Sequence, residues 1–183
     1  MNAEARVTVD VVRARGWTCV RLRPKAKKPD GARWQMSADA DVVAGWFEAG
    51  ANVGLVCGET SKVAVLDPDE LLEWADMIDT LGQPCLPWVL TGSGKLHYYI
   101  AWIPDLPAKI LSPRDGRTVV GEIQRGPGLQ QVVLPGSIHP DTGLGYRWIT
   151  ERLGILCEPI DPVHDPLPDL AKDWRAWFYS AAP

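Results

Sequence analysis

Residues 63–69 read Val-Ala-Val-Leu-Asp-Pro-Asp, an apolar run that ends in two acids. Four consecutive apolar residues predict a central β-strand that is covered on both faces. Because side chains alternate along a strand, Asp67 and Asp69 are expected to project together from its end. Two carboxylates this close repel each other unless a cation compensates. The stretch therefore predicts a carboxylate pair for a metal ion, and the alternative is a plain strand end followed by a helix that Asp69 caps.

The apolar run lies within a pattern of short strands and helices. Hydrophobic periodicity predicts about eight strands and three or four helices. Helices are expected over residues 3–15, 38–49, 69–81 and 169–179, and strands over 17–22, 52–58, 62–67, 88–91, 96–102, 118–124, 130–134 and 146–149. Ser37 is expected to cap the second helix, and the proline-rich residues 157–168 are expected to form a linker or a surface strap. The fold class is therefore α/β or α+β, in one compact unit.

Composition excludes several classes of protein. The chain has 183 residues, of which 46% are hydrophobic, and this suffices for one domain with a core and excludes wholesale disorder. No apolar run reaches about 18 residues, so no membrane helix is expected. The N-terminal residues lack the apolar segment of a signal peptide, and the four cysteines, Cys19, Cys57, Cys85 and Cys157, are scattered. We therefore expect a reduced, cytoplasmic protein whose cysteines are small buried hydrophobic residues.

A glycine-rich turn, Thr-Gly-Ser-Gly-Lys-Leu-His at residues 91–97, is a second candidate for chemistry. Its glycines allow close backbone approach to a phosphate, and Ser93, Lys95 and His97 offer a hydroxyl, a cation and an imidazole. It is not a Walker A loop, because a leucine follows the lysine where that motif requires serine or threonine. The alternative is a hairpin turn followed by a structural histidine.

Three further segments carry polar residues that suit a binding site. Glu122 interrupts the apolar strand 118–124, where it is either a third metal ligand or a solvated edge residue. Ser137 and His139 follow a tight turn. They either make a second set of polar contacts with a ligand or are incidental polar residues of the turn. The loop 21–29 concentrates basic residues in a protein of net charge −4, which indicates either a phosphate-facing loop or a solvated run of charge. The histidines and cysteines lack the spacing of zinc ligands.

The order of these features resembles that of a known family. The series consists of Lys-Lys-Pro at 27–29, Trp46 at the end of a helix, Asn-Val-Gly-Leu at 52–55, the acids at 67 and 69, the glycine-rich turn to His97, Glu122 on a later strand, and Leu-Pro-Gly-Ser-Ile-His-Pro at 134–140 with Tyr146 and Trp148. Over residues 14–150 the chain resembles the bifunctional primase–polymerase (prim-pol) N-terminal domain of the archaeo-eukaryotic primase superfamily. It departs from the family pattern at Pro68, which separates the acids, and at Gly136, where the family often has a second proline.

The resemblance implies an RRM-like sheet whose strands carry the motifs, packed against an N-terminal α/β unit with the active site in the cleft between them. Residues 1–160 are taken as the catalytic domain and residues 161–183 as a proline-rich strap and C-terminal helix. By position, the resemblance implies Asp67, Asp69 and Glu122 as catalytic metal ligands and His97, Ser93, Lys95, Arg125, Ser137 and His139 as nucleotide-binding residues, and the basic loop adds Lys25, Lys27 and Lys28 as DNA contacts.

The activity that the resemblance implies is nucleotidyl transfer by a DNA primase and polymerase of a replication protein. Two Mg²⁺ or Mn²⁺ ions would act in transfer from a dNTP or NTP to a 3′-hydroxyl on a DNA template. Template and primer DNA, these nucleotides, and a helicase domain or protein are the expected partners, and no membrane is expected. Two alternatives are a non-catalytic RRM-like nucleic-acid-binding module and a metal-dependent nuclease that uses the same acids.

Overall fold

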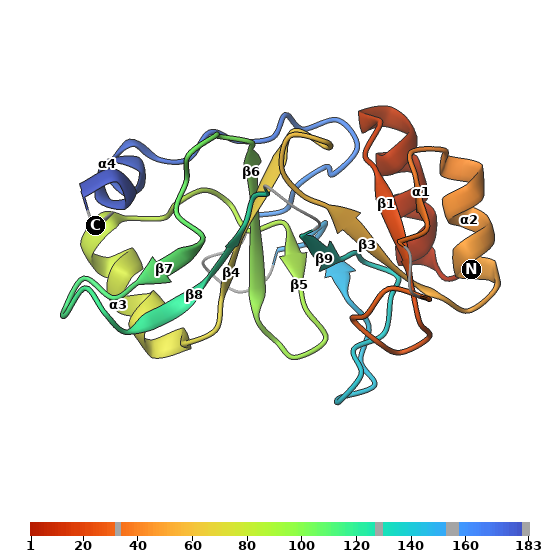
Figure 1. The fold of residues 1–183 in the computed structure, drawn as a ribbon, viewed down its shortest axis with the longest axis horizontal. Coiled ribbons are helices and arrows are strands. Elements are labelled where there is room, and N and C mark those ends of the chain that lie inside the picture. The colour runs from red at the N-terminus through yellow and green to blue at the C-terminus, as the bar shows by residue number, and fades with distance from the viewer. Residues whose placement is uncertain (32–33, 127–129, 153–157, 181–183) are drawn as a thin grey trace.

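The computed structural model describes residues 1–31, 34–126, 130–152 and 158–180. The helices of this part are α1 (Ala3–Arg15), α2 (Ala40–Glu48), α3 (Leu71–Leu81) and α4 (Lys172–Ser180), and the strands are β1 (Cys19–Leu22), β2 (Met36–Ser37), β3 (Asn52–Val56), β4 (Val63–Pro68), β5 (Val89–Leu90), β6 (Leu96–Ala101), β7 (Lys109–Leu111), β8 (Val119–Gln124), β9 (Gln131–Val133) and β10 (Arg147–Trp148). They form two antiparallel sheets, with the strand orders β2-β1-β3-β9 and β10-β5-β6-β4-β8-β7. Figure 1 shows α1 and α2 beside the first sheet and α3 and α4 at the far end of the second. The α+β fold class is confirmed.

Local capping signals set the ends of the first two helices. The side chain of Asn2 accepts a backbone hydrogen bond from the first turn of α1 (2.8 Å), and Gly16 ends the helix with a φ of 63°. The N-cap of α2 is Asp39, whose carboxylate accepts a backbone hydrogen bond from the first turn. The expectation that Ser37 caps α2 is wrong, because Ser37 is paired with β1 at the end of β2 and its hydroxyl accepts from the Asp39 amide.

Two strands that follow each other in the chain enter different sheets. β3 lies between β1 and β9 in the first sheet, whereas β4 is a central strand of the second, between β6 and β8. Val63, Ala64, Val65 and Leu66 of β4 are fully buried, as the continuous apolar run predicts. Their side chains alternate between two hydrophobic clusters, one on each face of the strand. Asp67 continues the face of Val65 and therefore points toward the space between the sheets.

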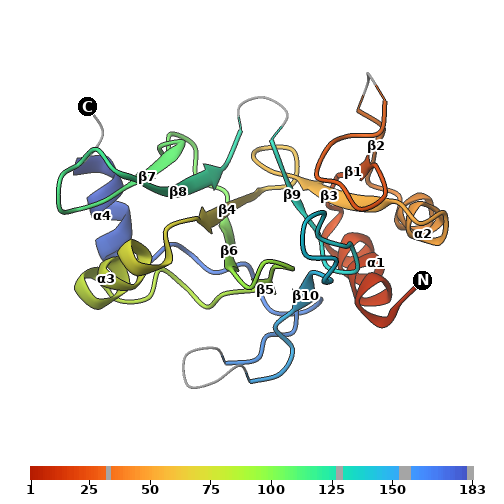
Figure 2. The same cartoon turned by 90° about the horizontal axis from the view of Figure 1, so that it is seen from below.

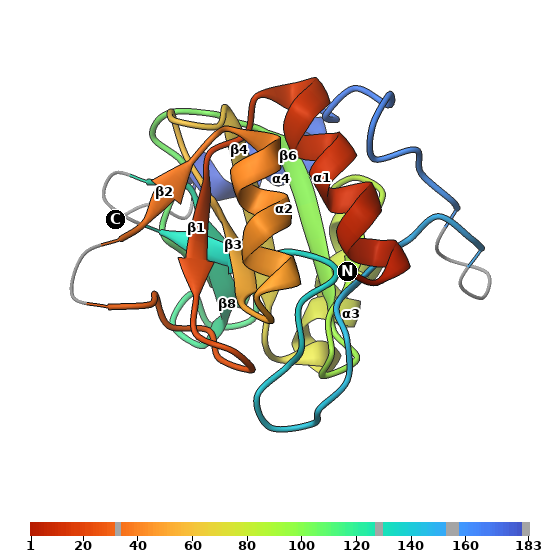
Figure 3. The same cartoon turned by 90° about the vertical axis from the view of Figure 1, so that its right-hand side faces the viewer.

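The two hydrophobic clusters lie on the two faces of the second sheet. One cluster joins α1, α2 and the first sheet to the inner face, and the other joins α3 and α4 to the outer face. Trp174 of α4 is fully buried against Trp74 of α3, and their ring centroids are 4.8 Å apart. Figure 3 shows α1 and α2 side by side, covering the first sheet. The second sheet is thus covered on both faces along β4 and β6.

The segment between residue 158 and α4 is a strap that crosses from one sheet to the other. Nε of Arg15 donates to the carbonyl oxygen of Pro162 (2.8 Å), and the carbonyl oxygen of Pro168 accepts from the Ala101 amide (2.9 Å). Figure 1 shows this segment, in blue, running along the upper edge of the molecule. Residues 158–168 are therefore a surface strap rather than a linker. The domain boundary at residue 160 stays a prediction.

Some elements differ from the sequence-based expectation. β2 and β7 were not expected, because edge strands of two or three residues are too short to show alternation. Cys19 and Cys57 are buried and Cys85 is partly buried, as expected, while Cys157 lies outside the described residues. Within the described ranges, no helix has both the length and the apolar character needed to cross a membrane.

Candidate functional site

A pocket lies between the two sheets, beside the end of β4. Its empty space is about 490 Å³, including the part that is open to solvent. It is lined by Lys27, Asp67, Asp69, Thr91, Ser93, Lys95, His97, Gln131, Val132, Val133 and Tyr146. Seen from below in Figure 2, β9, which contributes three of these residues, lies next to β4 and β6. The fold therefore gathers both acids of the first motif, the glycine-rich turn and one lysine of the basic loop around one space.

Asp67 is the innermost acid of this pocket. Its Oδ1 lies 3.3 Å from Nε2 of His97, which stands on the neighbouring strand β6. Burial alone would raise the pKa of Asp67, but the charge and the hydrogen bond of His97, with the charges of Lys27 and Lys95, outweigh it and leave this pKa below its ordinary value. Asp67 is therefore a carboxylate at neutral pH, although only 30% of its side chain is exposed to solvent.

Asp69 is held by the glycine-rich turn rather than by the helix that follows it. Its Oδ1 lies 2.7 Å from Nζ of Lys95. The N-cap position of α3 is Glu70, which makes no side-chain cap hydrogen bond. The alternative in which Asp69 caps the helix is therefore wrong. The two acids line the same pocket despite Pro68, which completes β4 between them.

The glycine-rich turn is a β-hairpin between β5 and β6. The hydroxyls of Thr91 and Ser93 are 2.9 Å apart, and the Lys95 amide donates to the Thr91 hydroxyl (3.0 Å). A side chain at Gly92 would collide with the backbone of Leu144, so the glycine is needed for contact with another loop of the chain. The hairpin interpretation is correct, and the turn nevertheless presents Ser93 and Lys95 to the pocket.

His97 is buried, with 5% of its surface exposed. While Nε2 faces Asp67, Nδ1 is buried without a hydrogen-bond partner among the described residues. The ring of Tyr146 lies 6.4 Å from the His97 ring, centroid to centroid. Burial, followed by the charge of Asp67, raises the pKa of Tyr146, so its hydroxyl stays protonated at the pocket wall.

Glu122 lies on β8, directly opposite Asp67 in the pairing of β4 with β8. Residues opposite each other in an antiparallel pair share a face of the sheet and have Cβ atoms about 4.5–5.5 Å apart. The Glu122 side chain is exposed, accepts a hydrogen bond from Nε2 of Gln124 (2.9 Å) and is not part of the pocket lining. It is thus the neighbour of the acid pair rather than a wall of the pocket.

The three acids fit a hard divalent cation in their donor chemistry, because Mg²⁺ and Mn²⁺ prefer carboxylate oxygens. They are not gathered into a ready site. Within the ranges given above, the structure contains no group of three or more His, Cys, Asp or Glu side chains that could hold a metal ion. Asp67 and Asp69 are instead paired with His97 and Lys95.

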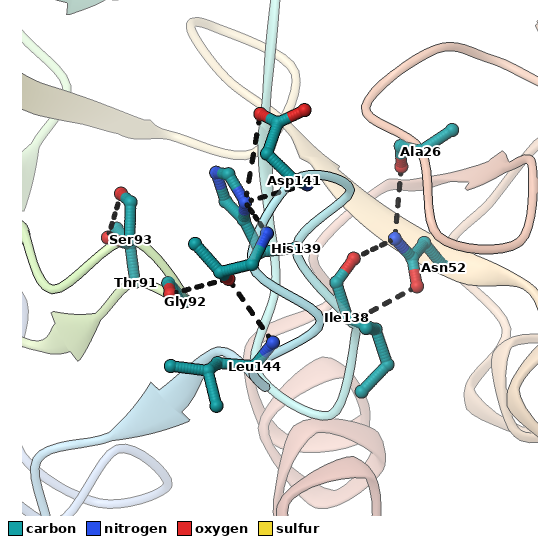
Figure 4. A network of polar contacts seen from close by, with 10 residues as sticks. Ala26, Asn52, Thr91, Gly92, Ser93, Ile138, His139, Asp141 and Leu144 are labelled. Carbon is teal, nitrogen blue, oxygen red and sulfur yellow. Dashed lines mark hydrogen bonds and ion pairs between the residues drawn. The ribbon is translucent and has the colours of Figure 1, made fainter.

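Three of the expected nucleotide-binding residues lie elsewhere. The hydroxyl of Ser137 is buried and exchanges hydrogen bonds with the backbone of Val53, which ties the loop to β3. His139 is buried, and its Nδ1 accepts from the amides of its own loop (Figure 4). Arg125 borders a different pocket, together with Trp102. Structural contacts account for these side chains, and their nucleotide-binding role stays a prediction without support from this arrangement.

Five pocket residues were not singled out as site residues from the sequence: the apolar Val132 and Val133, and the polar Thr91, Tyr146 and Gln131. Thr91 and Tyr146 belong to motifs that were recognised, and only their roles were missed. Gln131 begins β9, which borders the pocket only because β9 pairs with β3 in the other sheet. A glutamine at the start of an apolar strand gives no signal of that placement. Lys25, Lys27 and Lys28 are all exposed, and of these three Lys27 belongs to the lining.

Fold and site together define a protein with two antiparallel sheets and a pocket of acids and cations between them. The model of the family described as bifunctional DNA primase/polymerase, N-terminal (Prim-Pol) matches residues 9–169. The match spans most of the chain, so the chain belongs to this family, and the resemblance drawn from the order of the motifs is confirmed. Membership supports a primase or nucleotidyltransferase role. No curated protein matches the chain.

Three solved structures are similar to this chain at low identity. The catalytic domain of primase RepB′ in complex with initiator DNA is 12% identical, with 80% of this chain and 84% of that chain covered and a TM-score of 0.47. The AEP domain of the primase-polymerase of cyanophage S-2L is 17% identical, with 87% and 92% covered and a TM-score of 0.47. A further structure of primase RepB′ is 12% identical, with 79% and 55% covered and a TM-score of 0.45. Because these identities and TM-scores are low, the family assignment rests on the match of the family model alone.

Proposed function

We propose that this chain is a DNA-dependent nucleotidyltransferase, a primase and polymerase that joins a (d)NTP to a 3′-hydroxyl on a DNA template. The observation that carries the proposal is the pocket in which Asp67 and Asp69 face His97 and Lys95, in a chain of the Prim-Pol family. Two carboxylates beside a lysine and a histidine suit a ligand that combines divalent cations with phosphates.

The reaction forms a bond between the 3′-hydroxyl oxygen and the α-phosphorus and releases pyrophosphate. Two Mg²⁺ or Mn²⁺ ions, when bound by Asp67, Asp69 and Glu122, would lower the pKa of the attacking hydroxyl and neutralise the leaving group. The low pKa of Asp67 keeps this ligand ionised without help from the metal. The pairing of Glu122 with Asp67 across β4 and β8 supports its choice as the third acid of this proposal.

The cations of the pocket suit the phosphates of the incoming nucleotide. Lys95 would donate charge-assisted hydrogen bonds to phosphate oxygens, and His97 and the Ser93 hydroxyl would add further hydrogen bonds. Lys25 and Lys28, exposed on the basic loop and outside the pocket, would supply charge for the template backbone. Both sets of cations border or adjoin one pocket, so one binding mode can use them together.

The test is primer extension with Asp67→Asn. Purified protein is incubated with Mn²⁺, a labelled dNTP and a primed DNA template, and extension is measured by gel. Groups that stabilise developing charge are typically worth about 100- to 1000-fold in rate, so a loss of that size is expected. Asp79→Asn is the charge-matched control, since Asp79 is exposed on α3 and forms no ion pair in the part of the chain described here.

Three outcomes would contradict the proposal. Undiminished extension by the folded Asp67→Asn protein would remove the acid pair from catalysis. Template cleavage without extension by the unaltered protein would indicate the nuclease alternative. Retention of DNA with neither reaction would indicate a binding module.

A further inference from the structure

Lys27 differs from Lys95 and His97 of the pocket in having no acidic partner in the described part of the chain. Lys95 is paired with Asp69 (2.7 Å) and His97 faces Asp67 (3.3 Å). In the described ranges no carboxylate lies within ion-pair distance of Lys27, although it lines the pocket and its charge reaches both Asp67 and His139. An anion that enters the pocket can therefore bind the ammonium group of Lys27 without breaking an ion pair with one of the described carboxylates.

Two amide side chains hold the backbone that carries Lys27. Nδ2 of Asn52 donates to the carbonyl oxygen of Ala26 (3.0 Å), and Nε2 of Gln131 donates to the carbonyl oxygen of Lys27 itself (2.9 Å). Asn52 stands at the start of β3 with 2% of its surface exposed, and Gln131 begins β9. Two adjacent carbonyl groups of the basic loop are thus anchored to two paired strands of the first sheet.

The same asparagine connects the basic loop to the rest of the pocket rim. Asn52 also exchanges two hydrogen bonds with the backbone of Ile138, at 2.7 and 2.9 Å. Farther along that loop, the Thr142 hydroxyl donates to the carbonyl oxygen of Gly92 in the glycine-rich turn (2.8 Å). Figure 4 shows this chain of contacts from Ala26 through Asn52 and Ile138 toward Gly92. The basic loop and the glycine-rich turn are therefore fixed relative to each other.

The position of Lys27 separates it from its neighbours in the loop. All three lysines are exposed, but Lys25 and Lys28 lie outside the pocket, whereas Lys27 lines it together with Asp67 and Asp69. A triphosphate brings several negative charges into a pocket whose Lys95 and His97 already face Asp69 and Asp67. The unpaired ammonium group of Lys27 is placed to supply the missing charge.

Resting on the function proposed above, we propose that Lys27 binds the phosphates of the incoming nucleoside triphosphate, that Asn52 and Gln131 position it, and that contact with the DNA backbone is left to Lys25 and Lys28. This assignment divides the basic loop between two ligands. It gives the two amide side chains a role in nucleotide affinity through the loop they anchor.

The first test compares three variants that each remove one positive charge from the same loop. Binding of a dNTP and of inorganic tripolyphosphate, each with Mn²⁺, is measured by calorimetry for Lys27→Met, Lys25→Met and Lys28→Met, and binding of template DNA is measured by fluorescence anisotropy. Loss of a charge-assisted hydrogen bond predicts about 10-fold weaker binding of both phosphate ligands for Lys27→Met alone. Lys25→Met and Lys28→Met are expected to keep that affinity and to bind DNA more weakly.

Equal losses of nucleotide affinity in all three variants, or a loss confined to DNA binding in Lys27→Met, would overturn the assignment of Lys27. Those results leave the proposed function intact if the unaltered protein extends a primer. An unaltered protein that neither binds the dNTP nor extends a primer would instead overturn the proposed function.

The second test addresses the positioning role through a double-mutant cycle. Gln131→Met keeps the length of the side chain and removes the donor to Lys27, and it avoids the buried Asn52, whose replacement endangers folding. A raised KM for the dNTP with little change in kcat is expected. The double variant Gln131→Met/Lys27→Met should bind no more weakly than Lys27→Met alone, because the amide acts only through the lysine. Additive losses would show that Gln131 does not act through Lys27.

Discussion

Asp115 shows how much a single side chain of this protein depends on its neighbours. It lies in the turn between β7 and β8, where its Oδ1 accepts from the amides of Arg117 and Thr118 and its Oδ2 accepts from the Thr118 hydroxyl (2.6 Å). These bonds, with the Thr118 hydroxyl first, lower the pKa of Asp115 from 3.8 to about 2. An aspartate three residues before a threonine in a Gly-containing turn is a pattern that predicts such a turn from sequence.

We predict that Thr118→Val raises the pKa of Asp115 from about 2 toward 3.8, because it removes the hydroxyl donor and leaves the backbone donors in place. The folded-state pKa is depressed, so the stabilising contribution is present above the ordinary value near 3.8 and is lost as the pH falls through about 2. Carbon-detected NMR titration of the carboxyl group measures this. An unchanged pKa in the variant would show that the backbone donors alone hold it down.

At the scale of elements, helices and strands with strong periodicity were predictable and their ends were less so. The bounds of α1 agree with prediction, because both of its caps are local. α3 begins later than expected, and its apolar residue Leu72 is 85% exposed. Periodicity identifies the residues of a helix that could be buried, but tertiary packing determines which of them are buried.

The turn between β5 and β6 depends on another loop, which gives a second prediction. A Cβ at Gly92 would lie 2.5 Å from Cβ of His139 and from the carbonyl oxygen of Leu144. Gly92→Ala should therefore lower the free energy of unfolding by about 1–3 kcal/mol. The control is Gly45→Ala within α2, where a Cβ meets nothing within 4 Å and stability should rise by about 0.5–1 kcal/mol. Urea denaturation measures both, and equal effects would contradict the packing argument.

On the scale of the whole molecule, the C-terminal helix completes the outer core. Trp174 has no exposed surface, packs on Trp74 and Phe178, and donates from Nε1 to the carbonyl oxygen of Gly82 (2.7 Å). The strap that precedes it joins the end of β6 through Pro168. α4 and α3 therefore share one hydrophobic cluster on the outer face of the second sheet.

The third prediction follows from that packing. Trp174→Ala should cost about 3–5 kcal/mol of stability, because a large buried side chain is replaced by a cavity. Tyr179→Ala on the same helix is the control, since Tyr179 is 46% exposed and its loss should change stability by no more than about 0.5 kcal/mol. Thermal and urea unfolding followed by circular dichroism measure both. A Trp174→Ala protein as stable as the control would mean that α4 is dispensable for the fold.

The sequence by itself determined the buried central strand, the acids at its end, the glycine-rich turn and the family, because strand alternation and turn chemistry are local properties. Tertiary structure alone decided which polar residues share the pocket. β3 and β4 enter different sheets, which brings Lys27 and Gln131 to the pocket, while Ser137 and Arg125 are held elsewhere by backbone contacts. Strand pairing and loop packing determine which residues from distant parts of the chain come together. The spacing of residues within a motif contains no information about either.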